Sequence, residues 1–462
     1  MALWNRAFMT RDNEANRFSA RAGRYARLGV NAGAFAAKMG ASRLTGAGRS
    51  DDARAFTEAL GAMKGPMMKV AQLLATIPEA LPPEYSEQLM SLQSHAPPMG
   101  AAFVRRRMQA ELGADWREKF AEFDLTPAAA ASLGQVHRAK TLEGEPVASK
   151  LQYPDMASAV EADLTQLNML FSLRRRMGAA IDTREIAREI AARLREELDY
   201  QREAKVARLY ANMLSDRPQV RVPRVFPDLS TKRLLTLEWL DGAKLLEFES
   251  GSSESRTHIA TLLFEAWWRP FLRYGIIHGD PHLGNYSVVA RGAGDARRIE
   301  AVNLFDYGCV RIFPPRFVSG VVELYLALKT NDKARVIHAY ELWGFKNLSR
   351  ETIEAMNIWA KFICGPTLDD RVRTIADGVK PGEYGRREIA AVMRALRSQG
   401  ADLAVPREFV FMDRAAIGIG AAFLRLRAEM NFHRLYESAI EGFSVESVGA
   451  RQAEALAAAG LQ

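Results

Sequence analysis

The chain has 462 residues, of which 48% are hydrophobic and 26% are charged, with a formal net charge of +8. These values are typical of a soluble globular protein with a sizeable core, organised as two or three domains or as one large two-lobed unit. The two cysteines, Cys309 and Cys364, argue against a disulfide scaffold or a cysteine-based metal site and suit a reducing compartment.

Residues 1–50 are rich in Arg, Ala and Gly, and their only acids are Asp12 and Glu14. Arg residues recur there at helical spacing, so the segment can lie on an anionic membrane surface as a basic amphipathic helix. A solvated, partly disordered tail fits the same residues equally well. The chain shows no secretory signal and no apolar run of the roughly 20 residues that a membrane span needs. We therefore expect a cytoplasmic protein without a transmembrane helix, able to attach to the inner face of the membrane.

Residues 51–96 predict helices with an apolar face of Met, Val and Leu. Pro82 and Pro83 end one helix and start the next, because proline fits the first helical turn but not the interior. Lys69 and Gln72 lie within this region, and their residue types alone predict exposed polar positions. Residues 101–118 predict one more short helix.

A run of small residues at 127–134 precedes an alternating strand at 136–140, a turn at Gly144 and a strand at 146–152 that contains Lys150. This pattern predicts a β-hairpin. It is typical of a nucleotide-binding lobe, in which the backbone approaches the phosphates and a cation pairs with them. Each alanine carries a Cβ that limits such an approach, and a helix start or a packed turn would also explain the run.

Residues 156–214 predict long helices with the acids Glu197, Asp199 and Glu203. Asp199 and Glu203 are four residues apart and are expected to share one helix face. A helix that follows the Lys strand commonly supplies the carboxylate that fixes this Lys. Solvated carboxylates paired with Arg195 and Arg202 are the alternative.

Two more strands are predicted at 220–227 and 233–240. They lead into a connector at Glu238–Gly242 whose backbone amides could bind the edge of an adenine. Residues 256–274 predict an apolar, aromatic helix in the core of a second lobe.

The most informative motif runs from His278 to Asn285 and is followed by a strand at 286–290, a second strand near 299–305 and Asp306-Tyr307-Gly308. This is the order of a protein-kinase catalytic loop and metal-binding loop. A phosphoryl acceptor needs a carboxylate to orient it, here Asp280. The triphosphate needs Mg²⁺ held by hard oxygen ligands, here Asn285 and Asp306. Past Gly308 the chain is predicted to be helical to its end, without an Ala-Pro-Glu motif.

His278, Asp280 and His282 could instead form a metal-ligand cluster, because imidazole and carboxylate at alternating positions suit Zn²⁺ or Fe²⁺. That interpretation leaves Lys150, Asn285 and the Asp306 turn unexplained.

Several motifs together resemble the UbiB/AarF atypical kinase-like proteins, which include the coenzyme Q-associated ATPases. Lys69-Val70-Ala71-Gln72 is similar to their Lys-x-Gly-Gln extension, and the Ala-rich run to their Ala-rich loop. Glu197-Leu198-Asp199 is similar to their Glu-x-Asp motif and His278–Asn285 to their catalytic loop. The resemblance covers residues 60–320. Four positions depart from the family pattern: Ala71, Ser149, Leu283 and Tyr307.

The resemblance implies a two-lobed α+β protein-kinase-like fold, with a small, mostly antiparallel β N-lobe and a helical C-lobe. An N-terminal helical extension would cover the active site. The implied parts are a basic segment at 1–50, the extension at 51–118, the N-lobe at 119–240 and the C-lobe at 241–462.

The resemblance also implies roles for individual residues. Asp280 and Lys150 would be catalytic, and Asn285 and Asp306 would bind Mg²⁺. Lys69 and Gln72 would project into the site, with Glu197 and Asp199 as their partners. The expected nucleotide-binding residues are Ala129, Ala130, Ala131, Ser132, Lys150, Glu203, Glu238 and Leu240.

The implied activity is that of a Mg-ATP-dependent ATPase or kinase supporting ubiquinone or other isoprenoid quinone biosynthesis, or membrane lipid homeostasis. Its implied partners are ATP, an anionic membrane surface, lipid or quinone precursors and quinone-biosynthesis proteins, with no nucleic acid. An ATP-binding pseudokinase that scaffolds biosynthetic partners is the alternative. A small-molecule kinase of the aminoglycoside or choline type shares the Asp/Asn/Asp set but does not account for Lys69–Gln72.

Overall fold

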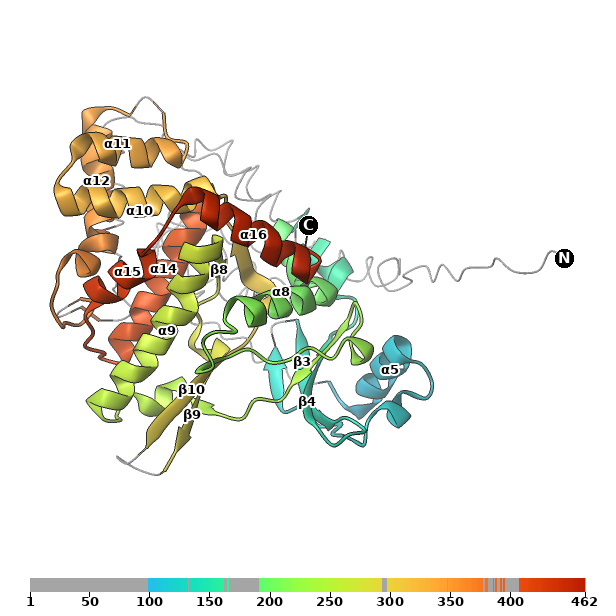
Figure 1. Cartoon of the computed structure of the whole chain (residues 1–462). Helices are drawn as coiled ribbons and strands as arrows, with labels where there is room; N and C mark the ends of the chain where they lie inside the picture. The colour runs from blue at the N-terminus through green and yellow to red at the C-terminus, as the bar shows by residue number, and fades with distance from the viewer. Residues whose placement is uncertain are drawn as a thin grey trace, which may run out of the picture. The chain divides into compact units, whose positions relative to one another are not determined.

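The structure is a computed structural model (Figure 1). It describes residues 99–461 except 132, 162–163, 166–190, 293–296, 347, 377–378, 381–384, 386, 389–390, 393 and 395–406. The basic segment at 1–50, Lys69 and Gln72 therefore lie outside the described residues, as does most of the expected helical extension. The chain divides into a first unit, Met1–Glu143 with Ser149–Asp199, and a second unit, Gly144–Ala148 with Tyr200–Gln462.

The described part of the first unit begins with helix α5 (Ala101–Leu112) and the 3-10 helix η1 (Trp116–Lys119). One helix was expected over 101–118, but α5 ends at Gly113, which takes a φ of 97° that disfavours other residues. Next comes an antiparallel sheet whose central strand β3 (Gly134–Lys140) pairs with β1 (Glu122–Phe123) and β2 (Ala129–Ala131). Strand β4 (Pro146–Gln152) follows β3, as the predicted hairpin requires.

The second unit contains α8 (Tyr200–Met213), β5 (Val220–Arg221), β6 (Leu234–Glu238) and β7 (Ala243–Lys244). The predicted strand at 220–227 is wrong beyond Arg221, because Pro223 and Pro227 have no N–H for a ladder. Only an isolated bridge, between Val225 and Leu237, remains there. The strand predicted at 233–240 is shorter, ending at Glu238.

Helix α9 (Ser253–Tyr274) is the predicted aromatic helix and contributes Trp267 and Phe271 to the main buried core. The Ser252 side chain caps its start, and Gly275 ends it with a φ of 65°. Strand β8 (Ile276–His278) follows directly. In Figure 1, α9 begins near the β9–β10 hairpin and ends beside β8.

Strands β9 (Tyr286–Arg291) and β10 (Arg298–Leu304) form an antiparallel pair, and β5 runs parallel to β10. Strand β11 (Val310–Ile312) pairs antiparallel with β8. The expectation that the chain is helical from Gly308 onwards is therefore wrong for these three residues, because they pair with β8 and the β-branched Val310 and Ile312 suit a strand.

The remaining described helices complete the second unit and share its core. They are α10 (Pro315–Thr330), α11 (Lys333–Leu342), α12 (Arg350–Cys364), α14 (Arg407–Arg425), α15 (Phe432–Ile440) and α16 (Val445–Ala459). Figure 1 shows α10, α11 and α12 together at one end of this unit.

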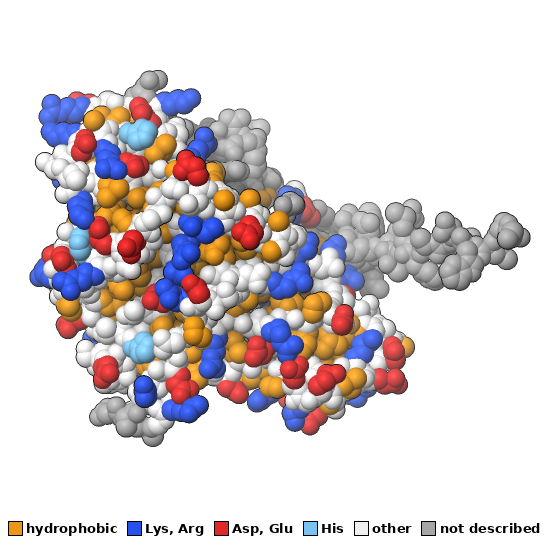
Figure 2. Space-filling model, viewed as in Figure 1, with side chains coloured by type: hydrophobic (Ala, Val, Ile, Leu, Met, Phe, Trp, Pro, Cys, Tyr) orange, Lys and Arg blue, Asp and Glu red, His pale blue; other side chains and the backbone are white. Residues whose placement is uncertain are grey.

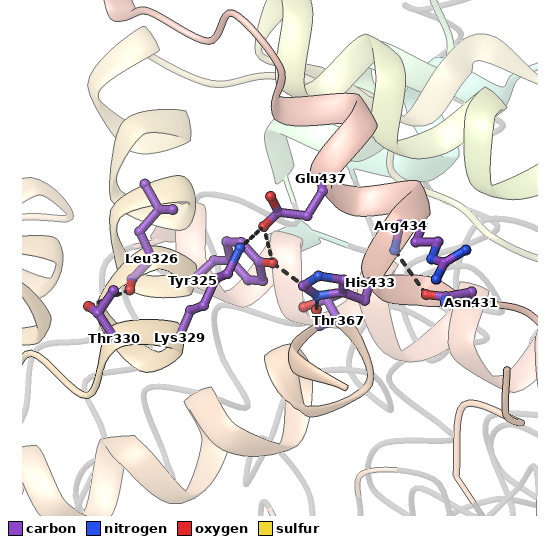
Figure 3. A network of polar contacts seen from close by, with 9 residues as sticks. All are labelled: Tyr325, Leu326, Lys329, Thr330, Thr367, Asn431, His433, Arg434 and Glu437. Atoms are coloured by element: carbon purple, nitrogen blue, oxygen red, sulfur yellow. Dashed lines mark hydrogen bonds and ion pairs between the residues drawn. The ribbon is translucent and has the colours of Figure 1, made fainter. Parts of the chain in front are cut away.

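A polar network joins α10, α15 and the turn after α12 (Figure 3). Glu437 accepts a hydrogen bond from the Tyr325 hydroxyl and pairs with Lys329 at 2.8 Å. The Nδ1 atom of His433 lies 2.7 Å from the Thr367 carbonyl oxygen. Lys329 and Tyr325 lower the pKa of the Glu437 carboxyl by binding its charged form. The network fixes the packing of these helices far along the chain from the Asp280 loop.

Within the described part of the chain, none of the helices combines the length and apolar character that crossing a membrane demands.

Candidate active site

The loop that carries Asp280 joins β8 to the 3-10 helix η4 (Leu283–Asn285) and then to β9. Its first residue, Gly279, donates its N–H to the Cys309 carbonyl oxygen at 2.9 Å. An added Cβ on Gly279 would lie 2.4 Å from that oxygen, so the close approach requires glycine. At the other end, the N–H of Phe305 donates to the Asn285 carbonyl oxygen at 2.9 Å. The loop is thus fixed to the segment that carries the Asp306 turn.

Asn285 connects directly to Asp280. Its side-chain Nδ2 donates to the Asp280 carbonyl oxygen at 3.0 Å and lies 3.2 Å from the carboxylate oxygen Oδ2. Only 9% of Asn285 is exposed. Because Nδ2 is held by Asp280, the amide presents Oδ1 on its other side as the atom that could bind a cation.

Asp306 is brought to the same place by strand register. Leu304 of β10 pairs with Tyr286 of β9, so the residue before β9 and the turn after β10 lie at one end of the hairpin. Asp306 has φ 60° and ψ 87°, an uncommon left-handed conformation for a residue other than glycine. Its Oδ1 accepts the Gly308 N–H at 3.3 Å. Strained backbone of this kind clusters at functional sites.

The side chains of His278 and Tyr307 are buried next to the Asp280 loop and the Asp306 turn. The Nε2 atom of His278 lies 3.0 Å from the Phe305 carbonyl oxygen. The Tyr307 hydroxyl donates to the Leu304 carbonyl oxygen at 2.7 Å, and its ring lies 5.9 Å from that of His278. Tyrosine therefore replaces the usual phenylalanine here without leaving its buried hydroxyl unpaired.

Glu203 of α8 belongs to the same region of the second unit and is 3% exposed. Burial raises the pKa of the Tyr307 phenol well above its ordinary value, and the charges of Glu203 and Asp306 raise it further. Tyr307 also lies against α8, since the Tyr210 ring is 5.4 Å from the Tyr307 ring. The second unit thus places Asp280, Asn285 and Asp306 at one end of the β9–β10 hairpin, and α8, which carries Glu203, contacts Tyr307.

Lys150 lies on β4 in the first unit and is half-buried. Its predicted pairing with Glu203 of the second unit stays a prediction. Within the first unit, Gln152 lies two residues along the same strand, and its Nε2 donates to the Leu198 carbonyl oxygen at 3.0 Å. This bond joins the Lys150 strand to the turn between Glu197 and Asp199. Our sequence reasoning missed Gln152, although a polar residue two positions after Lys150 in a predicted strand was a usable signal.

The expectation that Asp199 and Glu203 share one helix face is wrong. Residues 191–197 are helical, but the helix is interrupted at residues 198–199 and α8 begins only at Tyr200. The N–H of Leu198 donates to Arg195 O at 3.2 Å and that of Asp199 to Glu196 O at 3.0 Å. These tight i to i+3 bonds end the helix.

Three residues of the Ala-rich run form a short strand. Ala129, Ala130 and Ala131 make up β2, with Ala130 opposite Gln135 of β3. Gln135 is fully buried, and its amide bonds both the N–H and the carbonyl oxygen of Met99, at 2.9 and 3.1 Å. Ser132 lies outside the described residues.

Some main-chain N–H groups of the predicted adenine-binding connector have hydrogen-bond partners among the described residues, and others do not. The N–H of Glu238 donates to Arg224 O at 2.7 Å and that of Trp239 to Pro146 O at 3.0 Å. The N–H of Leu240 has no hydrogen-bond partner among the described residues. Glu238 and Leu240 are the two expected nucleotide-binding residues of this connector. Because the N–H of Glu238 already has a partner, the N–H of Leu240 is the one that could donate to a base.

The side chains around Asp280 that could bind a metal ion fit Mg²⁺ better than Zn²⁺ or Fe²⁺. Both imidazoles of the motif have backbone partners, since His278 contacts Phe305 O and His282 Nδ1 accepts the Gly284 N–H at 3.1 Å. Across the described ranges, no group of three or more His, Cys, Asp or Glu side chains could hold a metal ion. An amide and a carboxylate oxygen suit Mg²⁺, which usually takes its remaining ligands from phosphates and water.

Known proteins resemble this chain over most of the described residues. A family model described as the ABC1 atypical kinase-like domain matches residues 91–340. The chloroplastic protein ACTIVITY OF BC1 COMPLEX KINASE 8 of Arabidopsis thaliana is 31% identical over 284 residues, covering 60% of this chain and 36% of that protein. The mitochondrial atypical kinase COQ8 of Saccharomyces cerevisiae is 30% identical over 264 residues, covering 57% of this chain and 51% of that protein.

The chain thus matches only 36% and 51% of the length of these two relatives. Among solved structures, that of Rv3197 in complex with erythromycin, from Mycobacterium tuberculosis, has a TM-score of 0.57 at 28% identity. The match covers 84% of this chain and 95% of that one. The chain therefore belongs to the ABC1 atypical kinase-like family and has the two-lobed α+β protein-kinase-like fold that its sequence predicts.

Proposed function

We propose that the protein is a Mg-ATP-dependent atypical ATPase or kinase. The observation that carries the proposal is the arrangement at the end of the β9–β10 hairpin, where Asn285 is bonded to Asp280 and Asp306 occupies a left-handed turn. A kinase-like site needs an acceptor-orienting carboxylate beside oxygen ligands for the metal, and these residues have that chemistry.

Each residue has a distinct part in the proposed site. Asp280 orients the attacking hydroxyl or water, while Asn285 Oδ1 and the Asp306 carboxylate hold Mg²⁺. Bound Mg²⁺ would neutralise charge on the phosphates. Lys150 pairs with the phosphates and Glu203, and the N–H of Leu240 donates to adenine.

A regulatory contact is part of the same proposal. Lys69 and Gln72 project into the site, with Glu197 and Asp199 as partners. The Gln152–Leu198 bond supports it, because this bond holds the Glu197–Asp199 turn against the Lys150 strand.

The biological setting that we propose is ubiquinone or other isoprenoid quinone biosynthesis, or membrane lipid homeostasis. The resemblance to the coenzyme Q-associated ATPases supports it, as does the similarity to the relative named COQ8.

A basic surface supports a peripheral membrane location. Lys and Arg side chains form a stripe on the face of the second unit seen in Figure 2, over α9 and α16. Arg451 of α16 and Arg273 of α9 lie close together, since Arg451 Nε donates to the Arg273 carbonyl oxygen at 3.0 Å. Burial lowers the pKa of Arg451, and the neighbouring Arg273 lowers it further. Such a concentration of positive charge attracts anionic surfaces.

The alternative function is an ATP-binding pseudokinase that scaffolds biosynthetic partners. Two observations favour it: alanines occupy β2, where close phosphate contact would need glycine, and only β11 separates the Asp306 turn from α10.

Phosphate release from Mg-ATP by the purified chain, with and without anionic liposomes and a quinone-precursor mimic, separates the two functions. For the ATPase we expect Asp306→Asn to lower the rate by about 10²–10³-fold, because the metal loses a charged ligand. Asp228→Asn, at an exposed position, is the matched control and should leave the rate unchanged. Mg-ATP binding without phosphate release in the unmodified chain would support the pseudokinase instead.

A further inference from the structure

Helix α14 has a glycine, Gly418, at its contact with the Asp280 loop. Glycine in a helix interior weakens the helix relative to alanine, so its presence there calls for a local reason. An ideal Cβ on Gly418 would lie 2.1 Å from Cγ, 3.0 Å from Cβ and 3.4 Å from Cδ of Pro281. The rigid pyrrolidine ring cannot swing aside as a flexible side chain would. The helix therefore approaches the loop as closely as it does only because residue 418 has no side chain.

Pro281 is the residue directly after Asp280, and Gly279 is the residue directly before it. Gly279 packs against the carbonyl oxygen of Cys309, the residue directly before β11, and an added Cβ would lie 2.4 Å from that oxygen. Asp280 is therefore held between two contacts that leave no room for one more carbon atom, one with Cys309 and one with α14. Its carboxylate direction is fixed further by Asn285.

Two other helix glycines of this unit, Gly449 and Gly320, do not share this arrangement. A Cβ on Gly449 of α16 would lie 3.6 Å from Pro315 Cγ, an ordinary van der Waals contact. A Cβ on Gly320 of α10 would meet the Trp343 indole at 2.5 Å, but that contact lies between α10 and the segment after α11. Gly320 is therefore a tight packing position without a link to Asp280, and Gly449 is a tolerant one.

We propose that Gly418 is a positioning residue, which sets the place of Asp280 by letting α14 close on Pro281. The proposal rests on the proposed function, because it assigns the effect of this contact to the step in which Asp280 orients the acceptor. A displacement of about 1 Å at a reacting group can lower a rate by about 10²-fold. The contact should affect kcat much more than the KM for ATP, since Pro281 adjoins Asp280, to which the proposed function assigns the acceptor, whereas adenine is assigned to Leu240.

The test uses the full chain and measures phosphate release from Mg-ATP together with Tm. We expect Gly418→Ala to lower kcat by about tenfold or more while KM for ATP changes less than about twofold. Pro281→Ala removes Cγ and Cδ, so the double variant Gly418→Ala with Pro281→Ala should recover most of the lost kcat. Gly449→Ala should match the unmodified chain. Gly320→Ala should lower Tm without changing kcat at a temperature where it is folded.

A wild-type kcat in folded Gly418→Ala, or a double variant no faster than the single one, would overturn the proposal. If Gly418→Ala does not fold, Pro281→Ala alone tests the contact by removing atoms, and unchanged kcat in that variant would overturn it.

Failure of the proposed function can be distinguished from failure of the positioning role of Gly418. If the unmodified chain releases no phosphate, hydrogen exchange of the Gly284 and Asn285 amides still reports the loop, since both donate to His282. Faster exchange in Gly418→Ala than in Gly449→Ala would then support the positioning contact, and equal exchange would reject it.

Discussion

The Asp280 loop of the second unit and the Lys150 strand of the first unit are held by different kinds of contact. Around Asp280 the chain backbone itself is packed tightly, with Gly279 against Cys309 O and Pro281 against Gly418. Along the Lys150 strand buried polar side chains provide the contacts, among them the Gln152 bond to Leu198 O.

The two regions are therefore vulnerable to different substitutions. A tightly packed backbone is disturbed by adding an atom, because nothing nearby can move cheaply. A strand held by buried side-chain hydrogen bonds is disturbed by deleting a donor, because the partner is left unpaired away from water.

The largest effect is expected from Gly279→Ala. The new methyl group would lie 2.4 Å from Cys309 O, so either the β8–β11 pairing or the Asp280 backbone must shift. We expect phosphate release to fall by about 10²-fold and stability by about 1–3 kcal/mol. Chemical denaturation and steady-state kinetics measure the two effects.

Gly365→Ala is the matched control, because residue 365 has αR backbone geometry and no atom within 4 Å of an added Cβ. It should be neutral. Normal kinetics in Gly279→Ala would show that the backbone around Asp280 is not tightly constrained.

A smaller effect is expected from Gln152→Leu, which removes the donor to Leu198 O and should lower stability by about 1–3 kcal/mol. Hydrogen exchange over residues 191–199 should rise, because the Glu197–Asp199 turn loses its bond to β4. Gln201→Leu changes an exposed glutamine by the same atoms and should have little effect. If both variants unfold at the same denaturant concentration, the hydrogen bond of the buried Gln152 side chain does not stabilise the first unit.

The smallest effect concerns pH. His137 of β3 is fully buried, with Nδ1 2.8 Å from Asp124 O and Nε2 2.9 Å from the Gln135 amide nitrogen. Burial lowers the pKa of this imidazole below 6.5, although Asp124 partly opposes the shift. The unfolded chain therefore takes up a proton at a higher pH than the folded chain. Stability from the neutral imidazole is complete above about pH 6.5 and is lost as the pH falls below it.

Thermal unfolding at about pH 7.5 and about pH 5.5 checks this expectation. The unmodified chain should lose more Tm on acidification than His137→Asn, which cannot titrate in this range. Equal losses would mean that His137 does not link first-unit stability to pH.

Several parts of the fold followed from the sequence because short-range chemistry determines them. Alternation and a glycine turn predicted the β3–β4 hairpin, and apolar spacing predicted α9, which Gly275 ends. The motif from His278 to Asp306 predicted a loop, two strands and a turn in the right order. In these cases each residue type limits the conformation of its own neighbourhood.

Other features were decided only by the tertiary structure. Val310–Ile312 is too short for its β-branched residues alone to define a strand, and its pairing with β8 decides that it is one. The break before α8 separates Asp199 from Glu203, although the sequence looks helical throughout. The close approach of Gly418 to Pro281 joins residues that are far apart in the chain. Such contacts depend on which surfaces meet after folding, and a single sequence carries no local signal for that.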